Sequence, residues 1–323
     1  MDFGTNLGLE LGTPTRDAFG ETLVEIGENN PNLVVVDSDL NDSTRTKFFK
    51  ERFPARFINV GIAESNMVGV ASGLAASGKD VLASSFAAFL LGNAYDQIRM
   101  SIAYPNLPVK LVGSHSGISP GEDGPSQMAI EDMALAASFP NMTVLVPADA
   151  PATRWATSAM FQVDGPVYLR TSRPAAPVVY ASDNGFTVGK AKQVRHGGDV
   201  TIIACGLMVS AALEAAALLS SGYGIEARVL DMHTIKPIDR EAIERAAHET
   251  SGIVTAEEHS ITGGLGAAVS QIVSMTYPVP MAFVAIMDEY TRSGDPKELF
   301  ELFGLSPGYI VQAAARVVRD RQR

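Results

Sequence analysis

The chain has 323 residues, of which 46% are hydrophobic and 19% charged, and its formal net charge is −11. This composition is that of a folded globular protein rather than a disordered one, and the length suffices for about two domains. Because no basic face stands out against the acidic background, the sequence argues against nonspecific binding to nucleic acid.

The first half of the chain alternates short apolar, β-rich runs with helical patterns. Such alternation is typical of βαβ units, which build a mostly parallel sheet with helices on both faces. Strands are predicted at residues 33–37, 56–59, 81–85, 109–113, 143–146 and 167–169. Helices are predicted near residues 14–29, 43–53, 64–77, 88–104, 127–139 and 149–162.

A proline-bearing stretch at residues 173–177 and a polar segment at residues 181–198 interrupt this rhythm, and we predict a linker there. A second series of strands and helices follows. Its strands are expected near residues 199–205, 225–230, 252–257 and 281–287, and its helices near residues 207–221, 239–248, 264–275, 296–303 and 306–321. The predicted fold class is therefore α/β, with two tandem, open, mostly parallel domains at residues 1–180 and 181–323.

Cysteine usage and apolar run lengths bear on the location of the protein. Cys205 is the single cysteine, so no internal disulfide can form, and its apolar surroundings in the sequence predict a buried thiol. No apolar stretch reaches the roughly 18 residues that a membrane span requires, and the first residues lack the pattern of a secretion signal. We expect a cytoplasmic protein with no membrane or nucleic-acid partner.

Polar and aromatic residues follow several of the predicted strands in the first half. Open α/β sheets bind ligands at the carboxyl ends of their strands, so these residues are candidates for a site. Glu64 follows the second strand, Phe86 and Phe89 the third, His115 the fourth and Arg173 the sixth. Because parallel strands end at the same edge, the sequence predicts that these side chains converge there.

Each candidate also has a simpler interpretation. Glu64 could merely complement the positive end of its helix, which is worth a fraction of 1 kcal/mol. Phe86 and Phe89 could be core residues, His115 a hydrogen-bonded loop residue, and Asp123 the stabiliser of a glycine turn. It is the convergence of these residues on one edge that favours a catalytic site.

Other catalytic and binding motifs are absent from the sequence. It has no Gly-x-x-x-x-Gly-Lys phosphate loop, no Gly-x-Ser-x-Gly nucleophile turn and no cluster of residues with metal-ligand spacing, so no metal ligand is predicted. The glycines of residues 263–266 open a helix after a strand, but their spacing is wrong for a dinucleotide fingerprint. A tight entry into the helix explains them better.

Four stretches together resemble thiamine-diphosphate enzymes of the transketolase family, in particular their pyrimidine-binding and C-terminal domains. They are residues 59–67, which include Glu64; residues 85–89, with the phenylalanine pair; the loop from His115 to residue 125; and residues 288–294 near the end. The resemblance covers nearly the whole chain and implies thiamine diphosphate as the cofactor.

The resemblance implies a role for each cofactor-site residue. Glu64 would bond to N1′ of the aminopyrimidine and hold a proton there, which suits a carboxyl buried among apolar groups. Phe89, with Phe86, would stack on the pyrimidine ring. Asp39 and Ile62 would complete the cofactor contacts.

The resemblance also implies a site for a phosphorylated sugar. Arg16, Ser43, His115 and Arg173 match positions that bind the sugar phosphate, and arginine suits this task because its planar fork meets phosphate oxygens. His115 is expected to be catalytic together with Glu64. Asp123 matches the residue that contacts a donor hydroxyl.

Gln127 departs from the family pattern, because it stands where a histidine is expected. An amide can still hydrogen-bond to a hydroxyl, but it cannot shuttle a proton. This departure leaves open an unusual sugar or a carrier-bound acceptor.

The chain lacks the Gly-Asp-Gly motif with which this family binds the diphosphate through a divalent metal. The resemblance therefore implies a partner subunit that carries the diphosphate-binding domain and holds most of the contacts to Mg²⁺ or Ca²⁺. An α2β2 heterotetramer is expected. The predicted function is transfer of a two-carbon ketol unit by a two-chain transketolase.

Two alternatives remain open at this point. The β subunit of a 2-oxoacid dehydrogenase E1 component shares the fold and also needs an α chain, but it has no use for a sugar-phosphate site. A noncatalytic assembly subunit could have lost a histidine at Gln127, although retention of Glu64, His115 and Asp123 argues against it.

Overall fold

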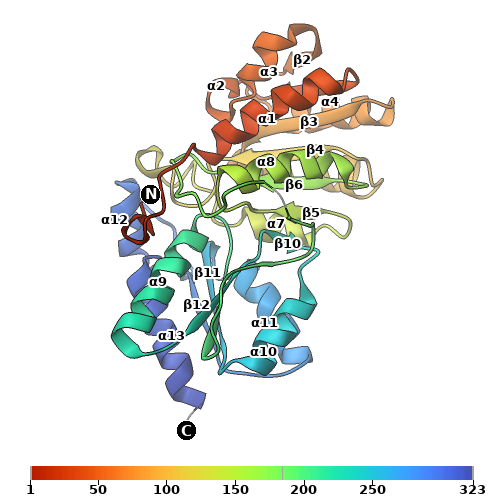
Figure 1. Cartoon of the computed structure of the whole chain (residues 1–323). Coiled ribbons are helices and arrows are strands. Elements are labelled where there is room, and N and C mark those ends of the chain that lie inside the picture. Colours follow the sequence, from red (N-terminus) through yellow and green to blue (C-terminus); the bar gives the residue numbers. More distant parts are fainter. Residues whose placement is uncertain (1, 184, 322–323) are drawn as a thin grey trace.

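The computed structural model describes residues 2–183 and 185–321, which form two β-sheets with helices packed on their faces (Figure 1). The first sheet has seven strands in the order β10-β5-β6-β4-β3-β1-β2, and the second has five in the order β12-β11-β8-β9-β7. All neighbours are parallel except the β10–β5 and β7–β9 pairs. The predicted fold class, two mostly parallel α/β units, is confirmed.

The first sheet is assembled almost entirely from the first half of the chain. Its strands are β1 (Leu33–Asp37), β2 (Phe57–Asn59), β3 (Asp80–Phe86), β4 (Lys110–Ser114), β5 (Thr143–Leu145), β6 (Val167–Arg170) and β10 (Thr234–Lys236). The associated helices are α1 (Thr15–Asn29), α2 (Asn41–Thr44), α3 (Lys47–Arg52), α4 (Glu64–Ala76), α5 (Ala87–Asn93), α6 (Tyr95–Ile98), the π-helix η3 (Arg99–Ala103), α7 (Asp132–Ser138) and α8 (Ala150–Ala159).

The second sheet carries its own two layers of helices. Its strands are β7 (Lys192–Arg195), β8 (Val200–Ala204), β9 (Ala227–Asp231), β11 (Ile253–Ser260) and β12 (Met281–Ile286). The helices are α9 (Met208–Tyr223), α10 (Arg240–Glu249), α11 (Leu265–Met275), α12 (Pro296–Leu302) and α13 (Pro307–Arg321). In Figure 1, α9 and α13 lie on one side of this sheet and α10 and α11 on the other.

Two parts of the sequence form elements that the sequence pattern did not predict. β7 lies within the predicted linker and pairs with β9 in antiparallel fashion. β10 follows β9 in sequence but joins the first sheet beside β5. Each of these strands has only three or four residues, so neither shows the alternation that identifies a strand from sequence.

Three predicted helices are also shorter or broken in the structure. The helix predicted at residues 43–53 is divided into α2 and α3 by Arg45 and Thr46, and Arg45 has a left-handed backbone, with φ of 68°. The helix predicted at 88–104 is divided among α5, α6 and η3. The helix predicted at 127–139 begins only at Asp132, because the preceding residues form a turn and an isolated bridge between Ser116 and Ala129.

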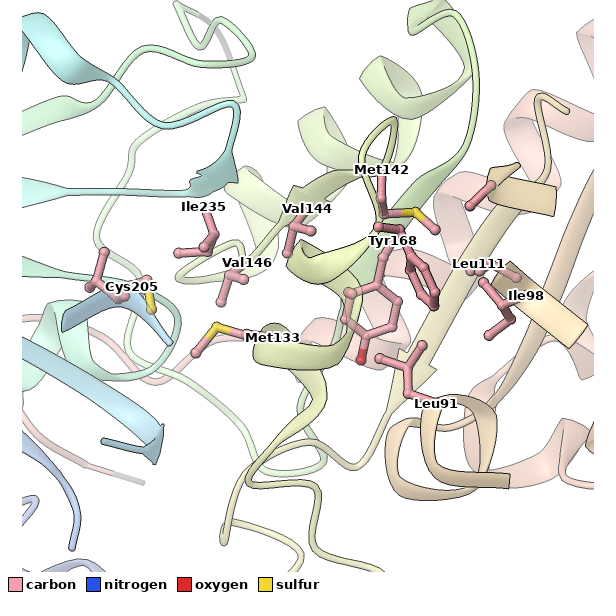
Figure 2. Close-up of a cluster of buried hydrophobic side chains, with 14 of the residues drawn as sticks. Leu91, Ile98, Leu111, Met133, Met142, Val144, Val146, Tyr168, Cys205 and Ile235 are labelled. Atoms are coloured by element: carbon pink, nitrogen blue, oxygen red, sulfur yellow. The ribbon is translucent and has the colours of Figure 1, made fainter. Parts of the chain in front are cut away.

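One of the hydrophobic cores of the described residues connects the two sheets. Alternating side chains of β1 face opposite ways: Val35 packs in the core under α1, α3 and α8, whereas Val36 packs in the core under α4, α5 and α7. The latter core includes Ile235 of β10 and continues to the second sheet, where it includes Ile203 of β8 and Cys205, the residue that follows this strand (Figure 2). The prediction of a buried free thiol at Cys205 is confirmed, and burial raises its pKa.

A buried ion pair lies at the junction of the two sheets. Arg170, the last residue of β6, donates from Nε to Asp132 at 2.8 Å, and both side chains are at most 4% exposed. Its Nη2 donates to the backbone carbonyls of Ala129 and Glu258, and Tyr168 donates its hydroxyl to Asp132 at 2.7 Å. Arg170 therefore ties β6 and the start of α7 to β11 of the second sheet.

None of the helices in the described part of the chain is both long and apolar enough to cross a membrane.

We predict that Arg170→Ala lowers the free energy of unfolding by about 3–5 kcal/mol, because it leaves the Asp132 carboxylate buried without its cation. Chemical denaturation measures this loss. The double variant Arg170→Met with Asp132→Asn, which removes both charges and keeps an acceptor for Tyr168, should recover part of it. Arg240→Ala, which breaks an exposed pair with Glu244, is the control and should change stability by less than about 1 kcal/mol. An equal loss in the control and in Arg170→Ala would contradict the prediction.

Candidate active site

Glu64 is the first residue of α4, at the carboxyl edge of the first sheet. The turn before it is built by polar contacts: Asn59 donates its amide to Asp39 at 2.6 Å and accepts the backbone N–H of Gly61 at 2.9 Å. Gly61 has φ of 77°, a conformation that a residue without a side chain adopts readily. This turn directs Glu64 inward, where its side chain is 3% exposed.

The Glu64 carboxylate is surrounded by hydrogen-bond donors, whereas the sequence had led us to expect apolar neighbours. The hydroxyls of Ser38 and Ser85 lie 3.0 and 2.9 Å from Oε1, and the amide of Asn93 donates to Oε2 at 3.3 Å. Sequence reasoning did not single out these three residues. The signal available for two of them was position, since Ser38 follows β1 and Ser85 lies near the end of β3.

Three rings form a stack beside this carboxylate. Phe86 lies between the other two: its centroid is 5.6 Å from that of Phe89 and 3.9 Å from that of His115, with an interplanar angle of 22° in both cases. Phe86 is buried and Phe89 is partly exposed. The predicted phenylalanine pair is thus present as a stacked pair, with Phe89 accessible for contact with a planar ligand.

His115 is buried, and its protonation follows from its neighbours. Nε2 lies 3.3 Å from Nη1 of Arg16, which can only donate, so Nε2 is the acceptor. The ring proton therefore resides on Nδ1, which is 2.9 Å from Oγ of Ser114. Burial, together with the positive charges of Arg16, Arg173 and Arg45, lowers the pKa of His115 to about 3. The imidazole is neutral at physiological pH and serves as a hydrogen-bonding group.

Two arginines make the contacts among the other predicted substrate residues. Arg16, on α1, also donates to the backbone carbonyl of Ser43 at 3.2 Å. Arg173 donates to the Pro120 carbonyl at 2.7 Å and to Asp123 at 3.3 Å. Burial lowers the pKa of Arg16, and the charges of Arg45 and Arg173 lower it further. The structure thus brings Arg16, Ser43 and His115 together and couples Arg173 to Asp123.

Arg45 is a third guanidinium in this region, and sequence reasoning missed it. It pairs with Asp17 and donates to the Asp42 carbonyl, and its charge contributes to the lowered pKa of His115. Left-handed backbone conformations occur at Arg45, Asp39 and His115, with φ between 59° and 68°. Such conformations in non-glycine residues are uncommon and cluster at functional sites.

The remaining predicted residues lie nearer the solvent. Ile62 is 87% exposed, Asp39 is exposed, and Gln127 is partly buried with its side-chain oxygen 2.5 Å from Oγ of Ser126. Cavities of about 730 Å³ beside Tyr180 and about 1040 Å³ beside Phe283 have none of the candidate residues in their walls. The candidate site is an open edge of the sheet.

Within residues 2–183 and 185–321, no group of three or more histidine, cysteine, aspartate or glutamate side chains is arranged to hold a metal ion.

Comparison with known proteins gives two family matches. The model described as "Transketolase, pyrimidine binding domain" matches residues 12–178, and the one described as "Transketolase, C-terminal domain" matches residues 189–310. The 6-deoxy-6-sulfo-D-fructose transketolase subunit SqwH of Clostridium sp. (strain MSTE9) is 42% identical over 306 residues, which are 95% of each chain.

A solved split gene transketolase, described as an inactive β4 tetramer, superposes with a TM-score of 0.89 and 45% identity over 95% of this chain and 99% of that one. The single-chain transketolase of Homo sapiens is 41% identical over 308 residues, which are 94% of this chain but 49% of the human protein. The chain thus matches whole subunits of split enzymes and about half of a single-chain enzyme.

We predict that the His115 ring remains neutral from pH 8 down to about pH 5, as followed by NMR of the imidazole resonances. Arg16→Ala should raise the pKa of His115 part of the way toward its ordinary value near 6.5, because one nearby positive charge is removed while burial remains. Arg52→Ala, on the exposed surface of α3, should leave the titration unchanged. A midpoint near 6.5 in the unmodified chain would contradict the prediction.

Proposed function

The chain belongs to the transketolase family as the C-terminal subunit of a split enzyme that transfers ketol units with thiamine diphosphate, and we propose that its substrates are phosphorylated sugars and that an α2β2 assembly completes its active site. The observation that carries this proposal is the arrangement at one sheet edge. A buried carboxylate lies beside stacked phenylalanines, and these lie beside a histidine that contacts an arginine.

The residues around Glu64 fit the aminopyrimidine of thiamine diphosphate. Oε1 of Glu64 is occupied by two serine hydroxyls, whereas Oε2 has only the longer contact from the Asn93 amide and remains able to bond to a ring nitrogen. Phe89, supported by Phe86, offers an aromatic face to the same ring. When bound, this cofactor supplies a carbanion that accepts and donates the two-carbon unit. Glu64 would hold or release a proton at the pyrimidine nitrogen.

The arginines favour an anionic group at the end of the sugar. The guanidinium groups of Arg16, Arg173 and Arg45 all lie near enough to the neutral His115 for their charges to lower its pKa. Guanidinium groups bind phosphate through two parallel hydrogen bonds, and the neutral His115 ring, whose Nε2 accepts from Arg16, orients that guanidinium. Asp123, joined to Arg173, is the acceptor we assign to a donor hydroxyl.

The partner subunit would supply the diphosphate-binding domain and most of the ligands of the divalent metal. The chain spans about half of the single-chain human enzyme, and Ile62, next to Glu64, exposes an apolar side chain at the open edge. Burial of that side chain by a partner removes apolar area from water. We place the complex in the cytoplasm, in keeping with the single free cysteine.

The arginine cluster also separates this function from that of an E1 β subunit. An oxoacid substrate has no terminal phosphate, so Arg16 and Arg173 would have no phosphate group to bind. The cluster equally argues against a noncatalytic assembly subunit. Arg16 has a buried Nε without a hydrogen-bond partner and lies near the like charges of Arg45 and Arg173, an arrangement that is costly unless an anion binds there.

We predict that Glu64→Gln lowers kcat for ketol transfer about 10²–10⁴-fold in the complex reconstituted with its partner, thiamine diphosphate and magnesium, since an amide cannot exchange the proton. Steady-state kinetics measures the loss. Glu21→Gln, on the exposed face of α1, should retain full activity. Full activity of Glu64→Gln would rule out the proposed role.

We predict that Arg16→Ala and Arg173→Ala each raise KM for a ketose phosphate about 10–100-fold, because each removes charged hydrogen bonds worth about 1.5–3 kcal/mol. The matched control is Arg52→Ala, which removes an arginine from the same half of the chain. A ketose with a terminal sulfonate distinguishes phosphate from another anion at this site. Consumption of pyruvate or branched oxoacids, with no response of ketose KM to either variant, would favour the E1 alternative.

A further inference from the structure

We propose that Glu258, on β11 of the second sheet, is a positioning residue for ketol transfer. Its carboxylate holds the loop of residues 115–125, which carries His115 and Asp123, in the conformation that binds the donor sugar. The inference rests on the proposed function only for its kinetic test. All the candidate site residues lie in the first half of the chain. Glu258 lies in the second half, so the inference gives that half a direct role in positioning the site.

The contact between Glu258 and the loop is short and buried. Oε1 of Glu258 accepts the backbone N–H of Ser119 at 2.6 Å, across 139 residues of sequence, and both residues are at most 2% exposed. Burial raises the pKa of Glu258 to about 7, while the charge of Arg170 and hydrogen bonds from Ser119 and Ile118 oppose the rise. Arg170 also holds the Glu258 backbone carbonyl at 2.9 Å, so the strand that presents the carboxylate is itself fixed.

Gly117 shows how closely the loop passes over this carboxylate. A side-chain carbon added at Gly117 would lie 2.2 Å from Cδ and Oε1 of Glu258, and Gly117 has φ of 70°. On the other side, Ser116 donates its backbone N–H and its hydroxyl to the Thr171 carbonyl of the first sheet. Within four residues, the loop is therefore anchored first to one sheet and then, through Ser119, to the other.

The far end of the loop is also covered by the second half of the chain. Gly294 donates its backbone N–H to the Gly121 carbonyl at 3.4 Å. A side-chain carbon at Gly121 would lie 2.8 Å from Pro296, and one at Gly124 would lie 2.5 Å from Oγ of Ser293. Asp123 lies between these two glycines, so the residue assigned to the donor hydroxyl is held from two sides.

Glu257 provides a matched comparison one residue away. Its carboxylate faces α11 instead, and its oxygens accept the backbone N–H groups of Leu265 and Gly266 at 2.7 and 2.8 Å. Burial raises its pKa to about 7 as well. Adjacent residues of a strand point to opposite faces, so two buried glutamates of similar environment have different partners. Only Glu258 contacts the loop.

Loss of the Glu258 carboxylate would leave the Ser119 N–H buried without an acceptor, and the loop would relax to satisfy it. A shift of about 1 Å in positioning groups is enough to impair binding of the reacting sugar. We expect Glu258→Ala to lower kcat/KM for the ketose phosphate about tenfold or more, chiefly through KM, with the dissociation constant for thiamine diphosphate changed less than about twofold. Glu258→Gln retains Oε1 as an acceptor and should recover most of the loss.

The test combines steady-state kinetics of the reconstituted complex with amide hydrogen exchange of the full chain alone. In Glu258→Ala, peptides that cover residues 116–125 should exchange faster, whereas in the matched variant Glu257→Ala the increase should appear at the start of α11 and the donor KM should stay unchanged. The exchange measurement does not require activity. It therefore tests the contact even if ketol transfer is not the reaction of the complex.

Unchanged exchange at residues 116–125 in Glu258→Ala would overturn the inference, as would an unchanged donor KM in an active complex. A parallel loss of cofactor affinity and donor affinity, not recovered by Glu258→Gln, would also overturn it, because it would indicate general disruption. If the unmodified complex shows no ketol transfer while loop exchange responds to Glu258→Ala, the proposed function fails and the positioning contact stands.

Discussion

The guanidinium of Arg170 lies where the two sheets meet, and the geometry of the candidate site depends on where it holds the chain. It pairs with Asp132 and donates to carbonyls of two segments that are far apart in sequence. A buried guanidinium costs free energy unless its N–H groups have hydrogen-bond acceptors. The backbone segments that supply these acceptors therefore have little conformational freedom. The loop of residues 115–125 begins after β4, the strand paired with the β6 strand of Arg170, and the chain then continues to Asp132 at the start of α7. Arg170 thus fixes the segment that follows the loop, at Ala129 and Asp132, and the strand that presents Glu258 to the loop.

The cofactor side of the site follows from a different constraint, the parallel arrangement of β1, β3 and β4. Their carboxyl ends bring Ser38, Ser85 and His115 to one edge without any close relation in sequence. Glu64 reaches this edge because α4 begins there, and two serine hydroxyls then determine which of its oxygens stays open. Because the serine hydroxyls occupy Oε1, Glu64 presents only Oε2 to a ligand and can bond to a single ligand atom.

Much of this architecture could be predicted from sequence, because the long strands and helices have clear hydrophobic periodicity and the candidate residues lie at their ends. The predicted positions of Glu64, Phe89 and His115 relative to their strands agree with the structure, whereas Phe86 is the last residue of β3 rather than a residue after it. Position at the strand ends marks Ser38 and Ser85 as site residues, but their bonds to Glu64 could not be predicted, since a hydrogen bond between Ser85 and a residue 21 positions away leaves no local pattern. The role of Glu258 could not be predicted from sequence either. A glutamate in a strand is expected to be exposed, and its buried partner, the Ser119 N–H, is known only from the structure. β7 and β10 were not predicted for a related reason, since only their pairing with distant strands defines them.

The placement of β10 bears on how the chain can be divided. This strand belongs by sequence to the second half, yet it covers the edge of β5 in the first sheet. A fragment cut after the sixth strand would present β5 as a bare edge, with unpaired backbone groups that invite another chain to add itself there. The two halves are therefore not interchangeable building blocks. Any fusion, circular rearrangement or excised domain made from this protein must carry the short strand along with the sheet that it borders.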